Sequence, residues 1–180
     1  MRTLSIPVVR ALLKRRKLMM TELPENLVEM IQCGENTEVE FSRSAFRISK
    51  NVYRTVCAFS NRNGGHIFLG VEDDGEISGI VSESGSRIID ELAAVLGSGT
   101  INPPLLLSPK VYEYGGRTVI YIRVPCSNSV CRYEGRIYDR NYVSNIDITY
   151  NSDAVSSLYD RKYSPAMPCA GTFSGVYAGL

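Results

Sequence analysis

The spacing of apolar residues constrains the fold most strongly, because it changes several times along the chain between the helical and the strand period. Apolar residues that recur every three or four positions predict helices over residues 21–31, 48–59, 84–96 and 152–159. Short alternating or continuous apolar segments predict strands over residues 37–41, 67–71, 77–81, 111–114, 118–124 and 135–141. This order predicts an α+β fold with a mixed, mostly antiparallel sheet that is covered by helices.

Local signals mark the ends of several elements. Thr21 is predicted to cap the first helix, and Asn151 or Ser152 the last one. The Asp-Gly pair at residues 74–75 and the Gly-Gly pair at residues 115–116 are typical of tight turns between antiparallel strands. The sequence therefore predicts two hairpins.

Composition and the two ends of the chain bound its organisation. Residues 21–163 are expected to form one domain, between a basic arm over residues 1–20 and a tail over residues 164–180 that lacks any apolar period. Basic residues interrupt every apolar stretch of the arm, so we expect neither a signal peptide nor a membrane span. Only Cys126 and Cys131 are spaced closely enough for a metal or a disulfide, and the sequence favours reduced cysteines in a cytoplasmic protein.

The chain has almost no net charge, with 20 Lys and Arg against 19 Asp and Glu. Attraction to nucleic acid through bulk charge is therefore excluded, and any binding must depend on how the basic residues are arranged. Basic residues surround the start of the predicted second helix, and others alternate with tyrosines in the segment CRYEGRIYDRNY. The candidates are Arg43, Arg47, Lys50, Arg54, Arg132, Tyr133, Arg136 and Arg140, with Tyr138 and Tyr142 beside them.

Arginines neutralise phosphates and tyrosines stack on exposed bases, so this mixture favours a single-stranded or RNA ligand. The alternative is that the tyrosines line a sheet while the arginines solvate its edge, and the sequence leaves both open. The two basic segments can act together only if residues 131–142 fold back over the second helix. Pairing of two copies of the chain also stays open.

The segment GENTEVEFSRS, residues 34–44, gathers three glutamates at the start of a predicted strand. Strand alternation places Glu38 and Glu40 on one face, opposite Val39 and Phe41. On these residues alone, the glutamates share a solvated face, and the acidic residues 72–74 belong to a polar turn.

Four segments, in this order, carry a resemblance to a known family: GENTEVEF, VCAFSNRNGGHIFLGVEDDGEISGI, RTVIYIRVP and GRIYDRNYVSN. Together they resemble the Schlafen Alba-like domain, also called the divergent AAA-type DNA-binding domain, over about residues 23–159. The resemblance implies a Schlafen Alba-like fold and a DNA- or RNA-binding module of the kind found in transcriptional regulators. In animal Schlafens, related lobes form an endoribonuclease that acts on structured RNA such as transfer RNA.

The resemblance also implies an alternative function, a metal-dependent nuclease. Its three carboxylates fall on Glu35, Glu40 and Asp73, which would hold Mg²⁺ or Mn²⁺ because these cations prefer oxygen ligands. The family commonly has a lysine directly after the Glu-Phe pair, where this chain has Ser42 followed by Arg43. This departure counts against cleavage more than against binding.

The segment SNRNGGHIF suggests a second alternative, a nucleotide (ATP)-binding or interaction module. Consecutive glycines allow backbone N–H groups to approach an anion, but here they lead into a strand and lack the Walker spacing and its lysine. The sole histidine, His66, follows these glycines and is expected to be a strand residue whose ring is hydrogen-bonded.

Overall fold

The computed structural model describes residues 21–163. The arm over residues 1–20 and the tail over residues 164–180 lie outside the described residues. Within residues 21–163, no helix has the length and apolar character needed to cross a membrane.

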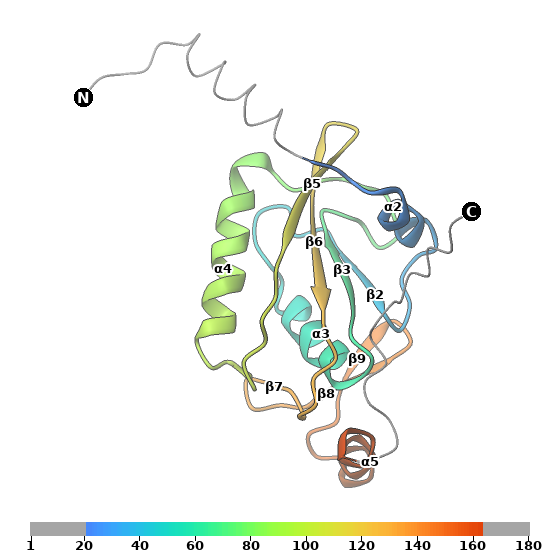
Figure 1. Cartoon of the computed structure of the whole chain (residues 1–180), viewed down its shortest axis with the longest axis vertical. Helices are drawn as coiled ribbons and strands as arrows, with labels where there is room; N and C mark the ends of the chain where they lie inside the picture. Colours follow the sequence, from blue (N-terminus) through green and yellow to red (C-terminus); the bar gives the residue numbers. More distant parts are fainter. Residues whose placement is uncertain (1–20, 164–180) are drawn as a thin grey trace, which may run out of the picture.

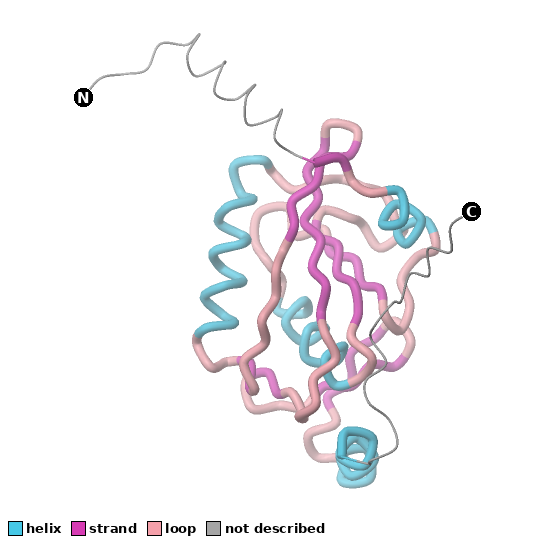
Figure 2. Tube along the Cα trace, in the orientation of Figure 1, coloured by secondary structure: helices cyan, strands magenta, loops and turns pink. Residues whose placement is uncertain are grey.

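A five-stranded sheet forms the centre of the domain, in the order β1-β5-β6-β3-β2, and two small two-stranded sheets accompany it (Figures 1 and 2). Four of the six strand pairings in the described chain are antiparallel, while β1 with β5 and β2 with β3 are parallel. The predicted mixed, mostly antiparallel α+β fold is therefore confirmed. The strands are β1 (Thr21–Glu22), β2 (Val39–Ser42), β3 (Gly65–Leu69), β4 (Ile101–Asn102), β5 (Lys110–Tyr114), β6 (Arg117–Val124), β7 (Arg132–Tyr133), β8 (Tyr138–Asn141) and β9 (Ser144–Asp147).

Helices cover both faces of the sheet. The side chains of Ile67 and Ile122 pack into a core with α3 and α4, whereas their neighbours Phe68 and Tyr121 pack with α2 on the other face. The helices are α2 (Glu25–Gln32), α3 (Lys50–Asn61), α4 (Gly85–Gly97) and α5 (Ser152–Tyr163), with a short 3₁₀ turn η1 (Ser82–Ser84) before α4. All four predicted helices in the described chain are thus confirmed.

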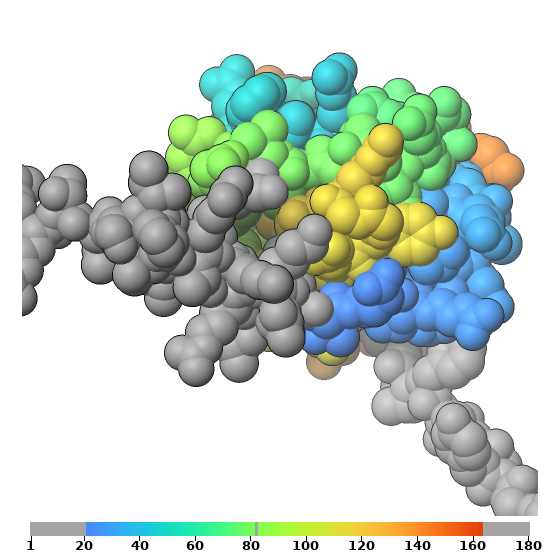
Figure 3. All heavy atoms as spheres, turned by 90° about the horizontal axis from the view of Figure 1, so that it is seen from above, coloured from blue at the N-terminus to red at the C-terminus, as the bar shows by residue number. Residues whose placement is uncertain are grey.

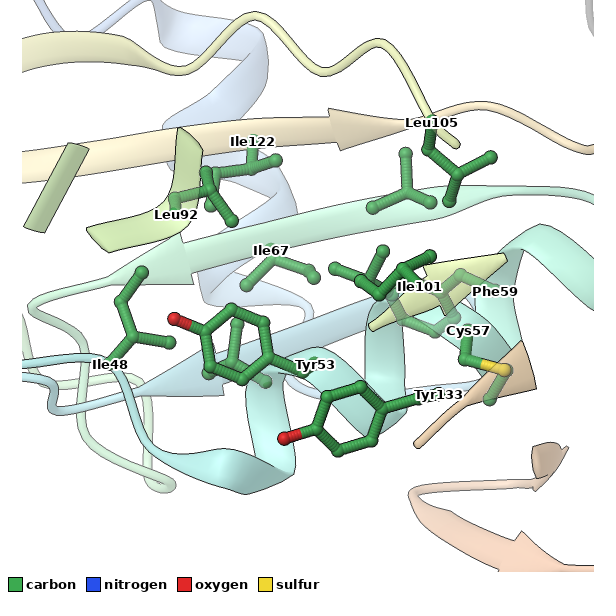
Figure 4. Close-up of a cluster of buried hydrophobic side chains, with 14 of the residues drawn as sticks. Ile48, Tyr53, Cys57, Phe59, Ile67, Leu92, Ile101, Leu105, Ile122 and Tyr133 are labelled. Carbon is green, nitrogen blue, oxygen red and sulfur yellow. The ribbon is translucent and has the colours of Figure 1, made fainter. Parts of the chain in front are cut away.

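The larger core lies between the sheet, α3 and α4 (Figure 4). Val56 and Phe59 of α3 are completely buried there, as their helical spacing predicts. Figure 4 also shows the rings of Tyr53 and Tyr133 side by side, with centroids 5.7 Å apart. This stacking fastens the β7 segment to α3.

The structure corrects the predicted start of the first helix. Thr21 lies in β1, where it pairs with Tyr112 of β5, and α2 begins only after Pro24. Proline has no N–H to donate and its fixed φ suits a helix start, so Pro24 marks the boundary that Thr21 was predicted to mark.

The first predicted hairpin is also only partly formed. After β3, residues 72–76 make the expected turn, with Glu72 N–H donating to Glu76 O at 2.8 Å. The returning segment makes isolated bridges, Val71 with Ile77 and Ile80 with Thr118, in place of a strand over residues 77–81. The second predicted hairpin, β5 with β6, is confirmed.

Candidate nucleic-acid interface

Glu40 lies in the middle of β2, on the face of the sheet that α3 covers. It is 4% exposed, and its Oε1 accepts hydrogen bonds from Asn51 Nδ2 at 3.0 Å and Thr55 Oγ1 at 3.1 Å. Alternation placed Glu40 opposite Val39 and Phe41, and this holds, because those two side chains pack in the other core. The expectation of a solvated face is wrong for Glu40, because both faces of this sheet are covered.

Arg140 of β8 neutralises Glu40. Its Nη2 lies 2.7 Å from Glu40 Oε2, and the side chain is 0% exposed. The guanidinium also donates to Asn145 Oδ1 at 3.1 Å and to Asn36 O at 3.2 Å, and it lies over the Phe59 ring, 5.1 Å from the centroid. Arg140 therefore cannot reach a phosphate, and its predicted role in nucleic-acid binding is withdrawn.

Glu35 lies beside Glu40 just before β2. Its Oε1 accepts the backbone N–H of Phe41 at 2.7 Å. Burial raises the pKa of the Glu35 carboxyl, and the charge of Asp73 raises it further. Burial likewise raises the pKa of Glu40, with a smaller contribution from Glu35, while Arg140 opposes the shift. The carboxylates that influence one another are thus those named by the resemblance, and Glu38 instead accepts from Asn63 Nδ2 at 3.3 Å.

These carboxylates do not fit a divalent cation. Oε1 of Glu40 accepts hydrogen bonds from Asn51 and Thr55, and Oε2 forms an ion pair with Arg140 at 2.7 Å. Among residues 21–163, no three His, Cys, Asp or Glu side chains are grouped so that they could hold a metal ion. A carboxylate that is already neutralised by arginine is a poor ligand, so we assign no metal to Glu35, Glu40 and Asp73.

Asp74 stabilises the polar turn over residues 72–76. Its Oδ1 accepts the backbone N–H of Glu76 at 2.9 Å. Glu72 forms an ion pair with Arg43 at 3.4 Å, which links this turn to the segment after β2. The expectation that the acidic residues 72–74 belong to a polar turn is therefore confirmed.

Four basic residues surround the start of α3, and we call them the basic surface: Arg43, Arg47, Lys50 and Arg54. All four are exposed. Lys50 lies 3.6 Å from Glu134, and the Arg54 guanidinium lies over the Tyr138 ring, 5.7 Å from its centroid. The exposed Lys50–Glu134 ion pair is weak, so it leaves the charge of Lys50 exposed.

Residues 132–147 fold back against α3, as combined action of the two basic segments requires. Asn145 Nδ2 donates to Asn51 Oδ1 at 3.2 Å and to Thr55 Oγ1 at 2.7 Å. Tyr133 is only 3% exposed and stacks on Tyr53, so its predicted stacking on bases is withdrawn. Tyr142, at the turn between β8 and β9, is exposed and stays a candidate.

Two arginines of this segment stay candidates with partners of their own. The exposed Arg136 pairs with Asp147 at 2.6 Å, and Arg132 Nη2 lies 3.3 Å from the Tyr159 hydroxyl. Sequence reasoning missed Arg87 of α4, whose Nη2 donates to Phe46 O at 2.9 Å and so places its charge beside the basic surface. No local pattern pointed to Arg87, because the contact joins elements that are distant in the sequence.

The glycines of SNRNGGHIF serve packing. A Cβ atom on Gly64 would lie 2.5 Å from Val124 O, and one on Gly65 would lie 2.3 Å from the Phe59 ring. The positive φ of Gly64, +83°, further restricts this position to glycine. The Gly64 N–H donates to Phe59 O at 2.9 Å, so it is not free to hold a phosphate, which removes the support for a phosphate cradle and for ATP binding at this turn.

His66 is hydrogen-bonded on both nitrogens, as expected. Nδ1 lies 2.8 Å from the Tyr121 hydroxyl and Nε2 lies 3.0 Å from Arg123 Nη1. Arginine can only donate, so Nε2 accepts and Nδ1 carries the proton. Burial and the Arg123 charge lower the pKa of His66 to about 4.

The cysteines form no metal site within residues 21–163. Cys33, Cys57 and Cys131 are free thiols, and Cys131 is therefore not joined to Cys126.

The comparison with family models agrees with the resemblance found in the sequence. Similar solved structures include the N-terminal domain of a RecG-related protein from Nitrosomonas europaea, named for ATP-dependent DNA helicases, which is 25% identical over 56% of this chain and 71% of that one, with a TM-score of 0.45. A protein from Corynebacterium diphtheriae is 17% identical over 69% of this chain, which corresponds to only 24% of its own length, with a TM-score of 0.45. The family model described as Schlafen, AlbA_2 matches residues 35–149, more than half of the sequence. This chain belongs to the Schlafen AlbA_2 family.

Proposed function

We propose that the protein is a nucleic-acid-binding domain, of the kind used by transcriptional regulators, which holds DNA or RNA on the basic surface. The observation that carries the proposal is the exposure of Arg43, Arg47, Lys50 and Arg54 around one helix start. Membership of the Schlafen AlbA_2 family supports it. Because the net charge is only +1, such a local group of cations supplies the attraction that the whole chain lacks.

The first turn of α3 has an unusual distribution of charge. It contains no acidic residue and begins with Lys50. A cation at the positive end of the helix dipole lowers helix stability, whereas a helix start that faces an anion benefits from both charges. The arrangement is therefore better suited to holding phosphate than to stabilising the helix.

Metal-dependent cleavage by Glu35, Glu40 and Asp73 is the less favoured function. Arg140 neutralises Glu40, so we infer that these carboxylates stabilise the fold beneath α3. Binding and cleavage give different outcomes in one experiment, because only cleavage shortens the labelled strand.

The test measures the affinity of the full chain for fluorescent single-stranded DNA, duplex DNA and transfer RNA at two salt concentrations, with and without Mn²⁺. The test variant is Arg47→Ala/Arg54→Ala. We expect weaker binding to every ligand, and a salt slope that is lower by about 1.8 on duplex and about 1.4 on single strands.

The matched control is Lys110→Ala/Arg161→Ala, which removes the same charge elsewhere. Lys110 is exposed on β5, and loss of Arg161 leaves Asp139 paired with Arg62 at 2.6 Å. Equal loss of affinity in both double variants would reject the basic surface as the binding site. A labelled strand that shortens only with Mn²⁺ would favour the nuclease instead.

A further inference from the structure

An exposed aromatic side chain stands beside the basic surface. Phe46 lies between β2 and α3, directly before Arg47, and is 61% exposed. No aromatic ring of the described residues stacks on it. A phenyl ring in water costs free energy that burial against a ligand would recover.

The backbone around Phe46 is held in place by other parts of the fold. Gly70 N–H donates to Ser42 O at 2.8 Å, and Val81 N–H donates to Ala45 O at 3.0 Å. Arg87 then donates to the carbonyl of Phe46 itself, and Ile48 is buried two residues later. The ring is therefore presented from an anchored loop, which reduces the entropy lost when a ligand packs against it.

Two arginines lie beside Phe46. Arg47 follows it in the sequence, and Arg87 is fastened to its carbonyl at 2.9 Å. One acidic residue of α4 reaches this loop: Glu91 Oε2 accepts the Ile48 N–H at 3.4 Å. In Figure 3 the cyan atoms, which belong to the segment around the start of α3, project from the rim of the molecule. This part of the surface is therefore open to solvent.

The chemistry of this part of the surface identifies one class of occupant. A flat apolar ring beside two arginines suits an unpaired base that is flanked by phosphates, because every base has a stacking face and every phosphate a negative charge. A paired base already has neighbours on both faces, so duplex gains nothing from the ring. We propose that Phe46 stacks on an unpaired base of single-stranded nucleic acid while Arg47 and Arg87 contact the adjacent phosphates.

This inference rests on the proposed function and adds its ligand class and stacking residue. The experiment compares Phe46→Ala with wild type on fluorescent single-stranded and duplex oligonucleotides of the same sequence. We expect affinity for single strands to fall about 5- to 150-fold, and affinity for duplex to change by less than about 2-fold. Phe46→Trp should retain single-strand affinity, because indole also stacks.

The matched control is Tyr114→Ala, which removes another exposed aromatic ring, on the β5–β6 hairpin. It should leave both affinities unchanged, and circular dichroism should show the same fold in every variant. The Arg47→Ala/Arg54→Ala variant separates the two proposals, because it should lower the affinity for both single-stranded and duplex oligonucleotides.

If that variant weakens binding and Phe46→Ala does not, the stacking inference is overturned and the proposed function stands; Phe46 would then suit a protein contact. Equal losses on single strands and duplex in Phe46→Ala would also overturn it. If no nucleic acid binds the wild-type chain, the proposed function itself fails.

Discussion

Arg140 Nη2 lies 2.7 Å from Glu40 Oε2, and the two buried side chains join the β8–β9 hairpin to β2 beneath α3. The contact brings together the first and last motifs that carried the resemblance in the sequence. Because the two charges neutralise each other in the interior, Glu40 and Arg140 stabilise the fold, while the arginines of the basic surface stay exposed.

We predict that Arg140→Met destabilises the domain by about 3–5 kcal/mol, because it leaves the Glu40 carboxylate buried without a counter-charge. Urea unfolding measures the loss. The double variant Glu40→Gln/Arg140→Met should lose less than the sum of the single variants, since neither charge is then stranded. The exposed Arg136 is the control, and Arg136→Met should leave the unfolding midpoint unchanged; equal effects at both positions would contradict a structural role for Arg140.

Asn61 at the end of α3 is a second buried polar contact with a testable role. Its Nδ2 donates to Tyr138 O at 2.8 Å and to Cys131 O at 3.0 Å, and its Oδ1 accepts Cys131 N–H at 2.7 Å. Asn61→Asp keeps the shape of the side chain but replaces the donating Nδ2 with an oxygen, which then faces the carbonyl oxygens of Tyr138 and Cys131. We expect a loss of about 2–4 kcal/mol in urea unfolding. The exposed Asn128 supplies the control, because Asn128→Asp should change the free energy of unfolding by less than about 0.5 kcal/mol.

The sequence predicted the helices well because their apolar spacing reflects one buried face, which is a local property of the chain. Alternation also predicted which way Glu40 points. It could not predict that α3 covers that side, because the cover depends on a crossover between parallel strands. Arg136 and Arg140 look alike in the sequence, and only tertiary packing makes one exposed and the other buried.

Boundaries and non-local contacts account for the remaining differences. Thr21 has a cap-forming side chain, but its backbone pairs with β5, so the pairing overrides the local signal. Tyr133 was predicted to stack on bases because it lies near arginines in the sequence, but it is buried in the core. Phe46 is also an aromatic residue next to an arginine, Arg47, but only the fold shows that its ring is exposed.

Gly65 tests the packing role of the glycine pair. Alanine at this position would place its Cβ against the Phe59 ring, so Gly65→Ala should destabilise the domain by about 1–3 kcal/mol in urea unfolding. Gly97, the last residue of α4, has open space around its Cα and a φ that alanine can adopt. Gly97→Ala should therefore be neutral or slightly stabilising. A neutral Gly65→Ala would show that this turn does not depend on close packing.

His66 predicts how stability depends on pH. Its pKa is lowered to about 4 in the folded chain, by burial and then by Arg123, against an ordinary value of 6.5. Between these values the unfolded chain binds a proton that the folded chain does not, so the contribution of His66 is complete above pH 6.5 and is lost as pH falls toward 4. Relative to His66→Gln, which does not titrate, the wild-type free energy of unfolding should fall by about 2 kcal/mol between pH 7 and pH 5. Urea unfolding of both proteins across this range measures it, and a difference between them that stays constant with pH would show that the imidazole is not held neutral between Tyr121 and Arg123.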